Sequence, residues 1–196
     1  MPKIALLDFD GVILDFPNAL KDYLATKCIN FKPENIESYN FNGDIGCTKK
    51  VVYEAINDAK LYSYLDFYEG AYLALEKLKS FVKVVAYTSV SSADGLSNLR
   101  NALISGLDLE GFAYIGGHNK KIEAISDYDN ADVDAVFEDC LETLEAWCSK
   151  PNVKLFLIKQ TYNCKTDENK SSPLWDRVVI CENFVDAVDK YIATLA

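Results

Sequence analysis

The sequence predicts an α/β fold in which a mostly parallel, Rossmann-like sheet is flanked by helices. Two observations lead to this fold class. Short apolar runs rich in β-branched and aromatic residues alternate with longer segments of helical spacing, and several of these runs end in acidic or hydroxyl residues. The chain has 196 residues, of which 49% are hydrophobic and 26% charged, values typical of a single folded globular domain.

Six runs have the features of strands that are buried on both faces of a sheet. Each is short and mainly apolar, without strict alternation of polar and apolar residues, as in strands of a parallel sheet. The runs are residues 4–7, 82–87, 113–115, 135–137, 153–158 and 177–180.

Segments with helical spacing lie between or after these runs, where crossover connections of a parallel sheet are expected. They are residues 71–81, 96–104, 141–148 and 184–195. The last segment has the strongest start signal, because Asn183 is a good N-cap residue and Asp186 follows three positions later.

One interval interrupts the alternation of strands and helices. From about residue 15 to residue 67 no strand is expected, and two helix-like stretches, 18–28 and 49–62, are joined by a loop rich in Asn, Gly and aromatic residues. The sequence therefore predicts a small helical cap at residues 15–68, inserted after the first strand. The remaining residues, 1–14 and 69–196, form the predicted catalytic core.

The charge of the chain limits its partners. Thirty acidic and twenty basic residues give a formal net charge of -10, which repels nucleic-acid polymers and anionic membrane surfaces but still allows a small anionic substrate in a pocket with local cations.

The six cysteines form no CxxC pair and are expected to be reduced thiols, and neither a signal peptide nor a membrane span is expected. We therefore expect a cytoplasmic monomer or homodimer that binds no polymeric nucleic acid and no membrane.

Acidic residues follow two of the predicted strands. Asp8 and Asp10 end the first, with Gly11 allowing a sharp turn, and Glu138 and Asp139 end the fourth. In open parallel sheets ligands bind beyond the carboxyl ends of the strands, so these carboxylates are expected to meet there and to repel one another unless a cation joins them. Mg²⁺ is the expected cation, because it prefers oxygen ligands and the sequence offers no cluster of soft ligands.

Hydroxyl and ammonium groups are expected beside these acids. Thr88 and Ser89 end the second strand, and Lys120 and Lys121 precede the apolar positions of a short helix. The sequence leaves the two lysines as alternatives and slightly favours Lys121, because the helical apolar positions begin directly after it. An acidic nucleophile, a metal, a hydroxyl and a lysine are the groups that phosphoryl transfer through a covalent aspartyl intermediate requires.

The order of these motifs resembles the haloacid dehalogenase superfamily of phosphohydrolases: DFDGV, a strand ending in TS, a lysine, and a strand ending in ED. The resemblance implies that Asp8 is the nucleophile and Asp10 the general acid and base. It implies that Thr88 binds the phosphoryl group and that Lys120 or Lys121 neutralises its charge.

The same resemblance implies a set of metal ligands. Asp8, the backbone carbonyl of Asp10, and Asp139 would hold Mg²⁺, and Glu138 would act directly or through water.

Within this superfamily, further segments are similar to the 5'(3')-deoxyribonucleotidases. They are DFDGVILDF at residues 8–16, FYEGAYLALEKLK at 67–79, QTYN at 160–163 and PLWDRVVICENFVDAV at 173–188. The chain departs from that family in its cap and in Glu138, because the family usually has Asp-Asp at the fourth motif. The resemblance implies dephosphorylation of a (deoxy)nucleoside monophosphate.

Substrate binding is assigned to Phe16, Tyr53, Thr88 and Ser89. Phe16 and Tyr53 are candidates to stack on a nucleobase, although aromatic residues at such positions more often pack in a core. Two alternatives remain open: a phosphatase or mutase that acts on a sugar phosphate or another small phosphometabolite, and a non-catalytic ligand-binding protein with the same scaffold.

Overall fold

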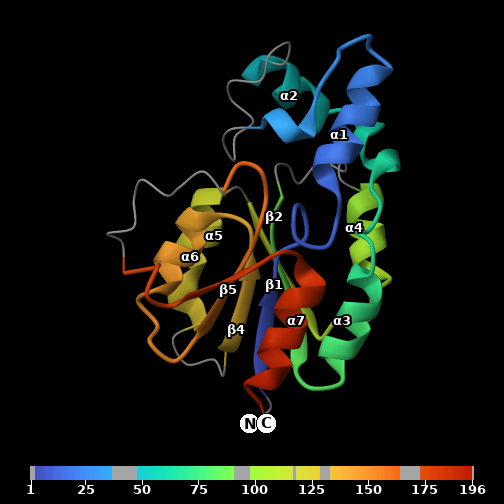
Figure 1. Ribbon diagram of the computed structural model, residues 1–196. Helices are drawn as coiled ribbons and strands as arrows, with labels where there is room; N and C mark the ends of the chain where they lie inside the picture. The colour runs from blue at the N-terminus through green and yellow to red at the C-terminus, as the bar shows by residue number, and fades with distance from the viewer. Residues whose placement is uncertain are drawn as a thin grey trace.

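The structure is a computed structural model that describes residues 3–36, 48–90, 98–116, 118–128, 133–163 and 173–195. Its strands form one six-stranded parallel sheet with the order β3-β2-β1-β4-β5-β6 (Figure 1). The strands are β1 (Ile4–Leu7), β2 (Lys83–Val90), β3 (Gly111–Gly116), β4 (Val133–Glu138), β5 (Lys154–Ile158) and β6 (Val178–Cys181). The predicted parallel α/β sheet is confirmed, and each predicted strand corresponds to one observed strand.

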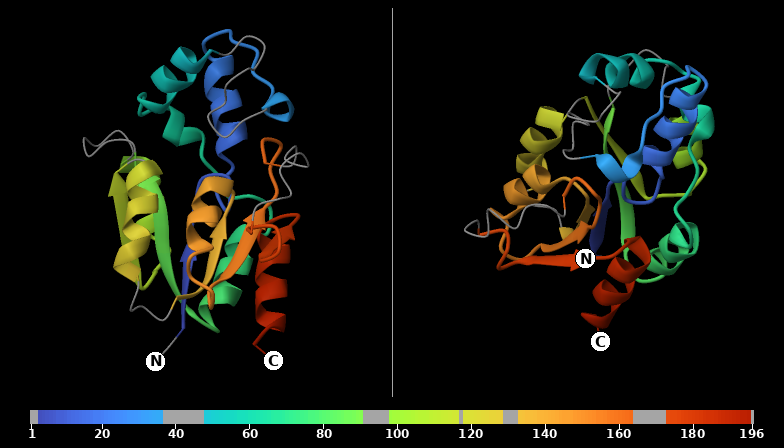
Figure 2. Two further views of the ribbon diagram at one scale, coloured as in Figure 1. Left: turned by 90° about the vertical axis from the view of Figure 1, so that its left-hand side faces the viewer. Right: turned by 45° about the horizontal axis from the view of Figure 1, so that its top comes forward.

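Helices lie on both faces of this sheet and beyond its carboxyl end. They are α1 (Phe16–Ala25), α2 (Lys49–Ile56), α3 (Ala71–Lys79), α4 (Asn98–Ser105), α5 (His118–Glu123), α6 (Leu141–Trp147) and α7 (Phe184–Ala193), with 3₁₀ helices η1 (Pro33–Asn35), η2 (Leu61–Tyr64) and η3 (Ala124–Tyr128). Buried side chains of α3, α4 and α7 pack on one face of the sheet, and those of α6 and η3 on the other. Figures 1 and 2 show the resulting three layers.

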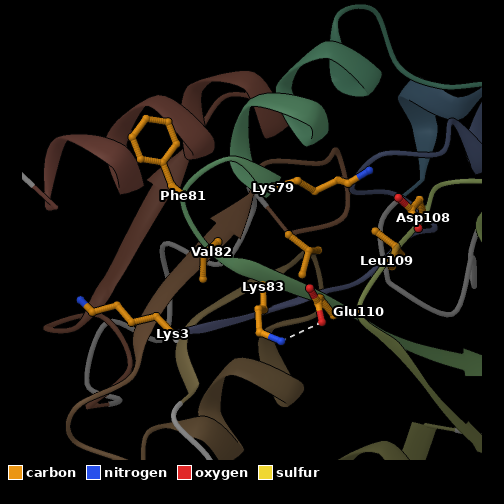
Figure 3. A pocket seen from close by; sticks show the side chains of 9 residues that line it. Lys3, Lys79, Phe81, Val82, Lys83, Asp108, Leu109 and Glu110 are labelled. Atoms are coloured by element: carbon orange, nitrogen blue, oxygen red, sulfur yellow. Dashed lines mark hydrogen bonds and ion pairs between the residues drawn. The ribbon is translucent and has the colours of Figure 1, made fainter. Parts of the chain in front are cut away.

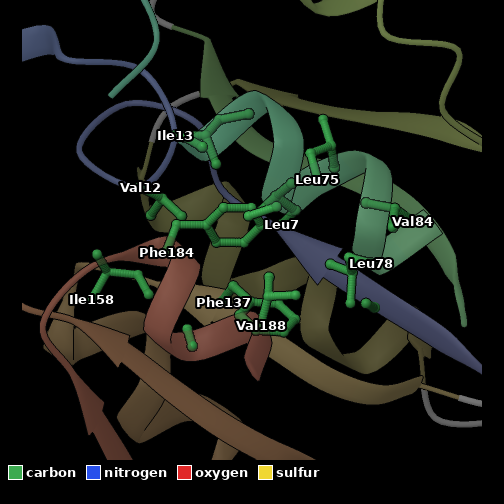
Figure 4. Close-up of a cluster of buried hydrophobic side chains, with 14 of the residues drawn as sticks. Leu7, Val12, Ile13, Leu75, Leu78, Val84, Phe137, Ile158, Phe184 and Val188 are labelled. Atoms are coloured by element: carbon green, nitrogen blue, oxygen red, sulfur yellow. The ribbon is translucent and has the colours of Figure 1, made fainter. Parts of the chain in front are cut away.

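The core on the α3 and α7 side is apolar and rich in aromatic rings. Leu7 and Phe137 of the sheet face Leu75 of α3 and Phe184 of α7 (Figure 4). The ring of Phe137 stacks on Phe156 with centroids 4.9 Å apart and meets Phe184 edge-on at 5.6 Å. This packing fixes the central strands from one side.

The helices of the predicted cap, residues 15–68, stand over the carboxyl end of the sheet (Figures 1 and 2). They form a hydrophobic cluster of their own, which includes Phe16, Leu20, Tyr62 and one residue of the β5–β6 connection, Tyr162. The two ends of the segment are held together, because the Asp15 N–H donates to the Asp66 carbonyl at 2.9 Å and a β-bridge joins Leu14 to Phe67.

One predicted helix in this segment differs from the structure. The stretch 49–62 is split, because α2 ends at Ile56 and η2 begins at Leu61. Between them the side chains of Asn57 and Asp58 hydrogen-bond to neighbouring backbone groups at 2.7 and 3.0 Å. Such local bonds compete with the helical ladder and favour its end.

Among the described residues, no helix combines the length and apolar character needed to cross a membrane. The four cysteines within the described ranges, Cys28, Cys140, Cys148 and Cys181, are free thiols, as expected. Cys47 and Cys164 lie outside the described residues.

Candidate active site

The register of the sheet brings the predicted acidic motifs together. Leu7, the last residue of β1, pairs with Ala86 of β2 and with Phe137 of β4. The N–H of Asp8 continues the ladder by donating to the Phe137 carbonyl at 3.0 Å. The first and fourth motifs therefore lie side by side at the carboxyl end of the sheet, as the sequence predicts.

Lys121 is the central cation of the site. It is only 1% exposed, and its ammonium lies 3.0 Å from Asp8 Oδ2 and 2.6 Å from Glu138 Oε2. The Tyr87 hydroxyl donates to the backbone carbonyl of Lys121, which ties α5 to β2. The structure therefore brings Lys121 to the acids, whereas the side chain of Lys120 lies outside the described residues.

This arrangement sets the charge of two carboxyl groups. Burial would raise the pKa of Asp8, but the Lys121 ammonium and the hydrogen bonds that Asp8 receives together hold that pKa below its ordinary value. Burial and the charge of Asp8 raise the pKa of Glu138 well above its ordinary value. Asp8 is therefore the carboxyl group that is held ionised at neutral pH, as a nucleophile must be.

Both oxygens of Glu138 already have partners. Oε2 accepts from Lys121, and Oε1 accepts from the backbone N–H groups of Asp139 and Cys140, each at 3.2 Å. Glu138 therefore holds the lysine and the first turn before α6 in place.

Asp139 has one oxygen engaged and one open. The Tyr162 hydroxyl donates to Oδ2, and the Asn163 side chain donates to the Asp139 carbonyl at 2.8 Å. Oδ1 is buried and has no hydrogen-bond partner among the described residues. Burial and the charge of Asp8 raise the pKa of Asp139 to about 7.

These acids fit a hard divalent cation. Asp8, Glu138 and Asp139 offer carboxylate oxygens within 4.8 Å of one another, and the open Oδ1 of Asp139 is the kind of orphaned acceptor that a cation satisfies. The backbone carbonyl of Asp10 is a predicted ligand of the same cation, whereas the Asp10 carboxylate is paired with an arginine.

That partner is Arg100 of α4, which the sequence analysis missed. Its Nε donates to Asp10 Oδ1 at 3.1 Å and Oδ2 at 2.9 Å, and its Nη2 lies 2.7 Å from Oδ2 and donates to Thr88 Oγ1. Burial would lower the pKa of Arg100, but the Asp10 carboxylate raises it, so the guanidinium stays charged. Because Thr88 accepts this bond, its single hydroxyl proton is free for another acceptor.

The turn at residues 160–163 completes the site from the β5 side. Gln160 Nε2 donates to the Gly11 carbonyl at 2.6 Å, and the Asn163 side chain also donates to the Ile158 carbonyl at 2.8 Å. This QTYN segment is part of the family resemblance, but the sequence predicts no contact for its side chains. Its amide side chains anchor the first motif and Asp139 to β5.

Gly11 is required at its position. Its φ of +81° is rarely adopted by other residues, and a Cβ there would lie 2.1 Å from Asp139 Oδ2 and 2.6 Å from the Tyr162 hydroxyl oxygen. The backbone of the first motif therefore passes directly against the acid and the tyrosine.

The predicted substrate-binding residues lie in different surroundings. Thr88 is buried beside Arg100, and Ser89 has a buried hydroxyl oxygen without a partner among the described residues. Phe16 is 8% exposed and packs in the cluster that contains Tyr162, whereas Tyr53 is 69% exposed on α2. Stacking of either ring on a base stays a prediction.

A separate cavity of about 390 Å³ lies at the opposite end of the sheet (Figure 3). Lys79, Lys83 and Glu110 are among the residues that line it. Its lysines are already paired, since Lys83 donates to Glu110 at 2.8 Å and Lys79 to Glu76 at 2.9 Å. This cavity does not adjoin the acidic cluster.

No protein-family model matches the chain, and no curated protein sequence matches it. Solved structures do match over the whole chain. A haloacid dehalogenase-like hydrolase from Burkholderia xenovorans LB400 has a TM-score of 0.60 at 16% identity and covers 100% of this chain and 99% of its own. A predicted phosphatase from Clostridium acetobutylicum has a TM-score of 0.60 at 15% identity, with 99% of each chain covered.

A third similar structure, described as a phosphoglycolate phosphatase from Lactobacillus plantarum, has a TM-score of 0.52 at 15% identity and covers 96% of this chain and 99% of its own. At these identities the likeness establishes the fold. The chain has the fold of haloacid dehalogenase-like hydrolases.

Proposed function

We propose that the protein is a Mg²⁺-dependent phosphomonoesterase that acts on a (deoxy)nucleoside monophosphate through an aspartyl-phosphate intermediate on Asp8. One observation carries the proposal: Asp8 is buried, held ionised by Lys121, and grouped with Asp139, whose Oδ1 has no partner among the described residues. The fold shared with haloacid dehalogenase-like hydrolases supports the same class of reaction.

In the first half of the proposed reaction, Asp8 attacks phosphorus and the bond from phosphorus to the leaving oxygen breaks. Lys121 and the free hydroxyl proton of Thr88 stabilise the charge on the phosphoryl oxygens. Asp10, which must be protonated when this step begins, gives its proton to the leaving oxygen, and the alcohol departs.

The contacts of Arg100 favour one oxygen of Asp10 as the carrier of this proton in the proposed reaction. Oδ2 receives both nitrogens of Arg100, at 2.9 and 2.7 Å, whereas Oδ1 receives only Nε, at 3.1 Å. The Asp10 side chain is also about one-third exposed. Oδ1 is therefore the oxygen from which Asp10 would donate its proton.

In the second half, Asp10 removes a proton from water, which attacks the phosphorus of the aspartyl-phosphate. The acyl phosphate bond breaks, phosphate leaves, and Asp8 is regenerated as a carboxylate. Asp8, Asp139 and the Asp10 carbonyl would hold Mg²⁺, with Glu138 acting through water because its own oxygens are engaged. When bound, Mg²⁺ supplies positive charge to the phosphoryl oxygens.

The substrate class rests on the resemblance to the deoxyribonucleotidases and on the aromatic cluster of the predicted cap. Phe16, Tyr62 and Tyr162 belong to this cluster, and Tyr162 also donates to Asp139. The aromatic cluster therefore reaches the acids through Tyr162, and a nucleoside attached to the phosphate would extend towards this cluster.

A sugar phosphate or another small phosphometabolite is the second candidate substrate. It is favoured by the burial of Phe16, which reduces the ring face available for stacking, and by the likeness to a structure described as a phosphoglycolate phosphatase.

The test is phosphate release from a panel of nucleoside 5'- and 3'-monophosphates, deoxynucleotides and sugar phosphates, with and without Mg²⁺. Each compound is also tested with Asp8→Asn and with Asp134→Asn. Asp134 is a matched acid near the other end of the sheet, paired with Lys3 and Lys154 at 3.1 Å each. We expect Mg²⁺-dependent release concentrated in the deoxynucleotides, absent in Asp8→Asn and retained in Asp134→Asn.

Release confined to sugar phosphates would select the second substrate class. Ligand binding without release in the wild type, kept in Asp8→Asn, would instead identify a non-catalytic binding protein and contradict the proposed reaction.

A further inference from the structure

Arg100 has one guanidinium nitrogen, Nη1, that takes no part in its contacts with Asp10 and Thr88. The side chain is 3% exposed, and Nη1 is buried with no hydrogen-bond partner among the described residues. A buried donor left unsatisfied is costly, and such a group in a native structure calls for an acceptor such as a water molecule or an anion.

The geometry of the guanidinium gives the direction of this acceptor. Its side-on edge, formed by Nε and Nη2, is occupied by the Asp10 carboxylate. Its end-on edge is formed by Nη2 and Nη1, and Nη2 donates from it to Thr88 Oγ1. Because the group is planar and rigid, Nη1 is the donor next to the Thr88 hydroxyl.

The Thr88 hydroxyl needs an acceptor in the same place. It accepts from Arg100, so its own proton points elsewhere, and it is 1% exposed. The Thr88 hydroxyl is therefore a neutral donor and Arg100 Nη1 a neighbouring charged donor, and neither has an acceptor among the described residues. An anionic oxygen satisfies both, and a guanidinium binds phosphate oxygens well.

The charges of the site support the same conclusion. Within the described ranges, four carboxyl groups, Asp8, Asp10, Glu138 and Asp139, meet two cationic side chains, those of Lys121 and Arg100. A dianionic phosphoryl group that enters such a site needs cationic contacts, and Lys121 is already shared between Asp8 and Glu138.

We propose that Arg100 is a substrate-binding residue whose Nη1 donates to an oxygen of the phosphoryl group beside Thr88. The proposal rests on the proposed phosphomonoesterase function and assigns that site a second cationic contact, supplied by α4. Arg100 then has two roles: it orients Asp10 and Thr88 through Nε and Nη2, and it binds the substrate through Nη1.

The test compares the wild type with Arg100→Lys, Arg100→Met and Arg177→Lys. Arg177 is a matched control, because it is a partly buried arginine, remote from the acids, that donates to the backbone carbonyls of Cys148, Lys150 and Val153. Two quantities are measured at saturating Mg²⁺: the affinity for inorganic phosphate by calorimetry, and KM and kcat with p-nitrophenyl phosphate. Urea denaturation identifies the variants that are folded.

We expect both Arg100 variants to bind inorganic phosphate at least tenfold more weakly and to raise KM by a similar factor. Arg177→Lys should lower the urea midpoint but keep the wild-type phosphate affinity. If Arg100→Met does not fold, Arg100→Lys decides the question, because it keeps a positive charge but lacks Nη1.

Wild-type turnover with unchanged phosphate affinity in a folded Arg100 variant would overturn this proposal and leave the proposed function intact. Arg100-dependent binding of phosphate by a wild type that releases none would contradict the proposed function and support the anion contact. A wild type that neither binds phosphate nor turns over substrate would overturn both.

Discussion

Replacement of Lys121 by methionine tests the buried ion cluster most directly. Methionine keeps an unbranched apolar stem but removes an ammonium that lies 2.6 Å from Glu138 and 3.0 Å from Asp8. Removal of one partner of a buried ion pair leaves an uncompensated charge and costs about 3–5 kcal/mol. For a chain of 196 residues this corresponds to a fall in Tm of roughly 6–20 °C.

We expect a loss of stability in the lower half of the range of about 3–5 kcal/mol, because Glu138 can become protonated and so reduce the cost of the uncompensated charge. The pKa of Glu138 is already raised by burial and by Asp8, so Glu138 takes up a proton readily once Lys121 is absent. The double variant Lys121→Met/Glu138→Gln should therefore be at least as stable as Lys121→Met, because it removes the remaining need to protonate Glu138.

The assay is urea and thermal denaturation at pH 7, followed by circular dichroism, with a chelator present so that no divalent ion binds the acids. Lys77→Met is the control, because Lys77 forms an exposed ion pair with Asp189 at 2.7 Å and should change stability by less than about 0.5 kcal/mol. If the Lys121→Met and Lys77→Met variants have the same midpoint, the argument from buried charge is refuted.

Three further predictions concern the first motif, the metal site and the predicted cap. Gly11→Ala should reduce phosphate release at least tenfold and stability by about 2 kcal/mol, because the new Cβ would lie 2.1 Å from Asp139 Oδ2 at a φ of +81°; wild-type turnover in this variant would contradict the contact. Affinity for Mg²⁺ should fall as the pH drops below about 7, because the raised pKa of Asp139 means that a proton must leave this carboxyl group before the ion binds. Calorimetry between pH 5.5 and 8.5 measures this affinity, and an affinity that does not change with pH would contradict the role of Asp139 as a metal ligand. Tyr23→Phe should cost about 1 kcal/mol at pH 7 by removing the bond to Asp58. Since burial and that bond raise the pKa of Tyr23 to about 12, the wild-type advantage should be complete below about pH 10 and shrink as the pH rises towards 12, which denaturation at several pH values would show.

The strands and the acids that follow them could be predicted, because both are recognised from short, local stretches of sequence. The run before Asp8 and the run before Glu138 are short and apolar, and each is followed at once by its acids. Parallel pairing of β1 with β4 then places Leu7 beside Phe137. The acids that follow these two residues therefore meet, although they lie far apart in the sequence and no further sequence pattern is needed to predict it. The choice between Lys120 and Lys121 was harder, because the two are adjacent and only the position of the helix distinguishes them.

Arg100 could not be predicted in the same way. It lies twelve residues after Thr88 in the sequence, inside α4 and away from any strand end. An arginine in a helix normally indicates a solvated face, and only the packing of α4 against the site reverses that interpretation. The sequence does not encode this packing in a short pattern.

The contacts of Gln160 and Asn163 were missed for a related reason. Their segment was noted only for its resemblance, and its amide groups bind the carbonyls of Gly11, Ile158 and Asp139. Amide side chains that brace backbone carbonyls leave no charge pattern in the sequence, so only their geometry identifies them.

The central position of β1 has a consequence for how the chain folds during synthesis. Residues 4–7 emerge from the ribosome more than a hundred residues before their partners in β4, residues 133–137. Until then the first strand lacks one neighbour, and Asp8 is far from both Lys121 and Glu138. Such distant pairings slow folding, because a long loop must close before they form. The charged cluster therefore assembles only after β4 has been translated, and a nascent chain stalled before β4 holds its first strand with one edge open.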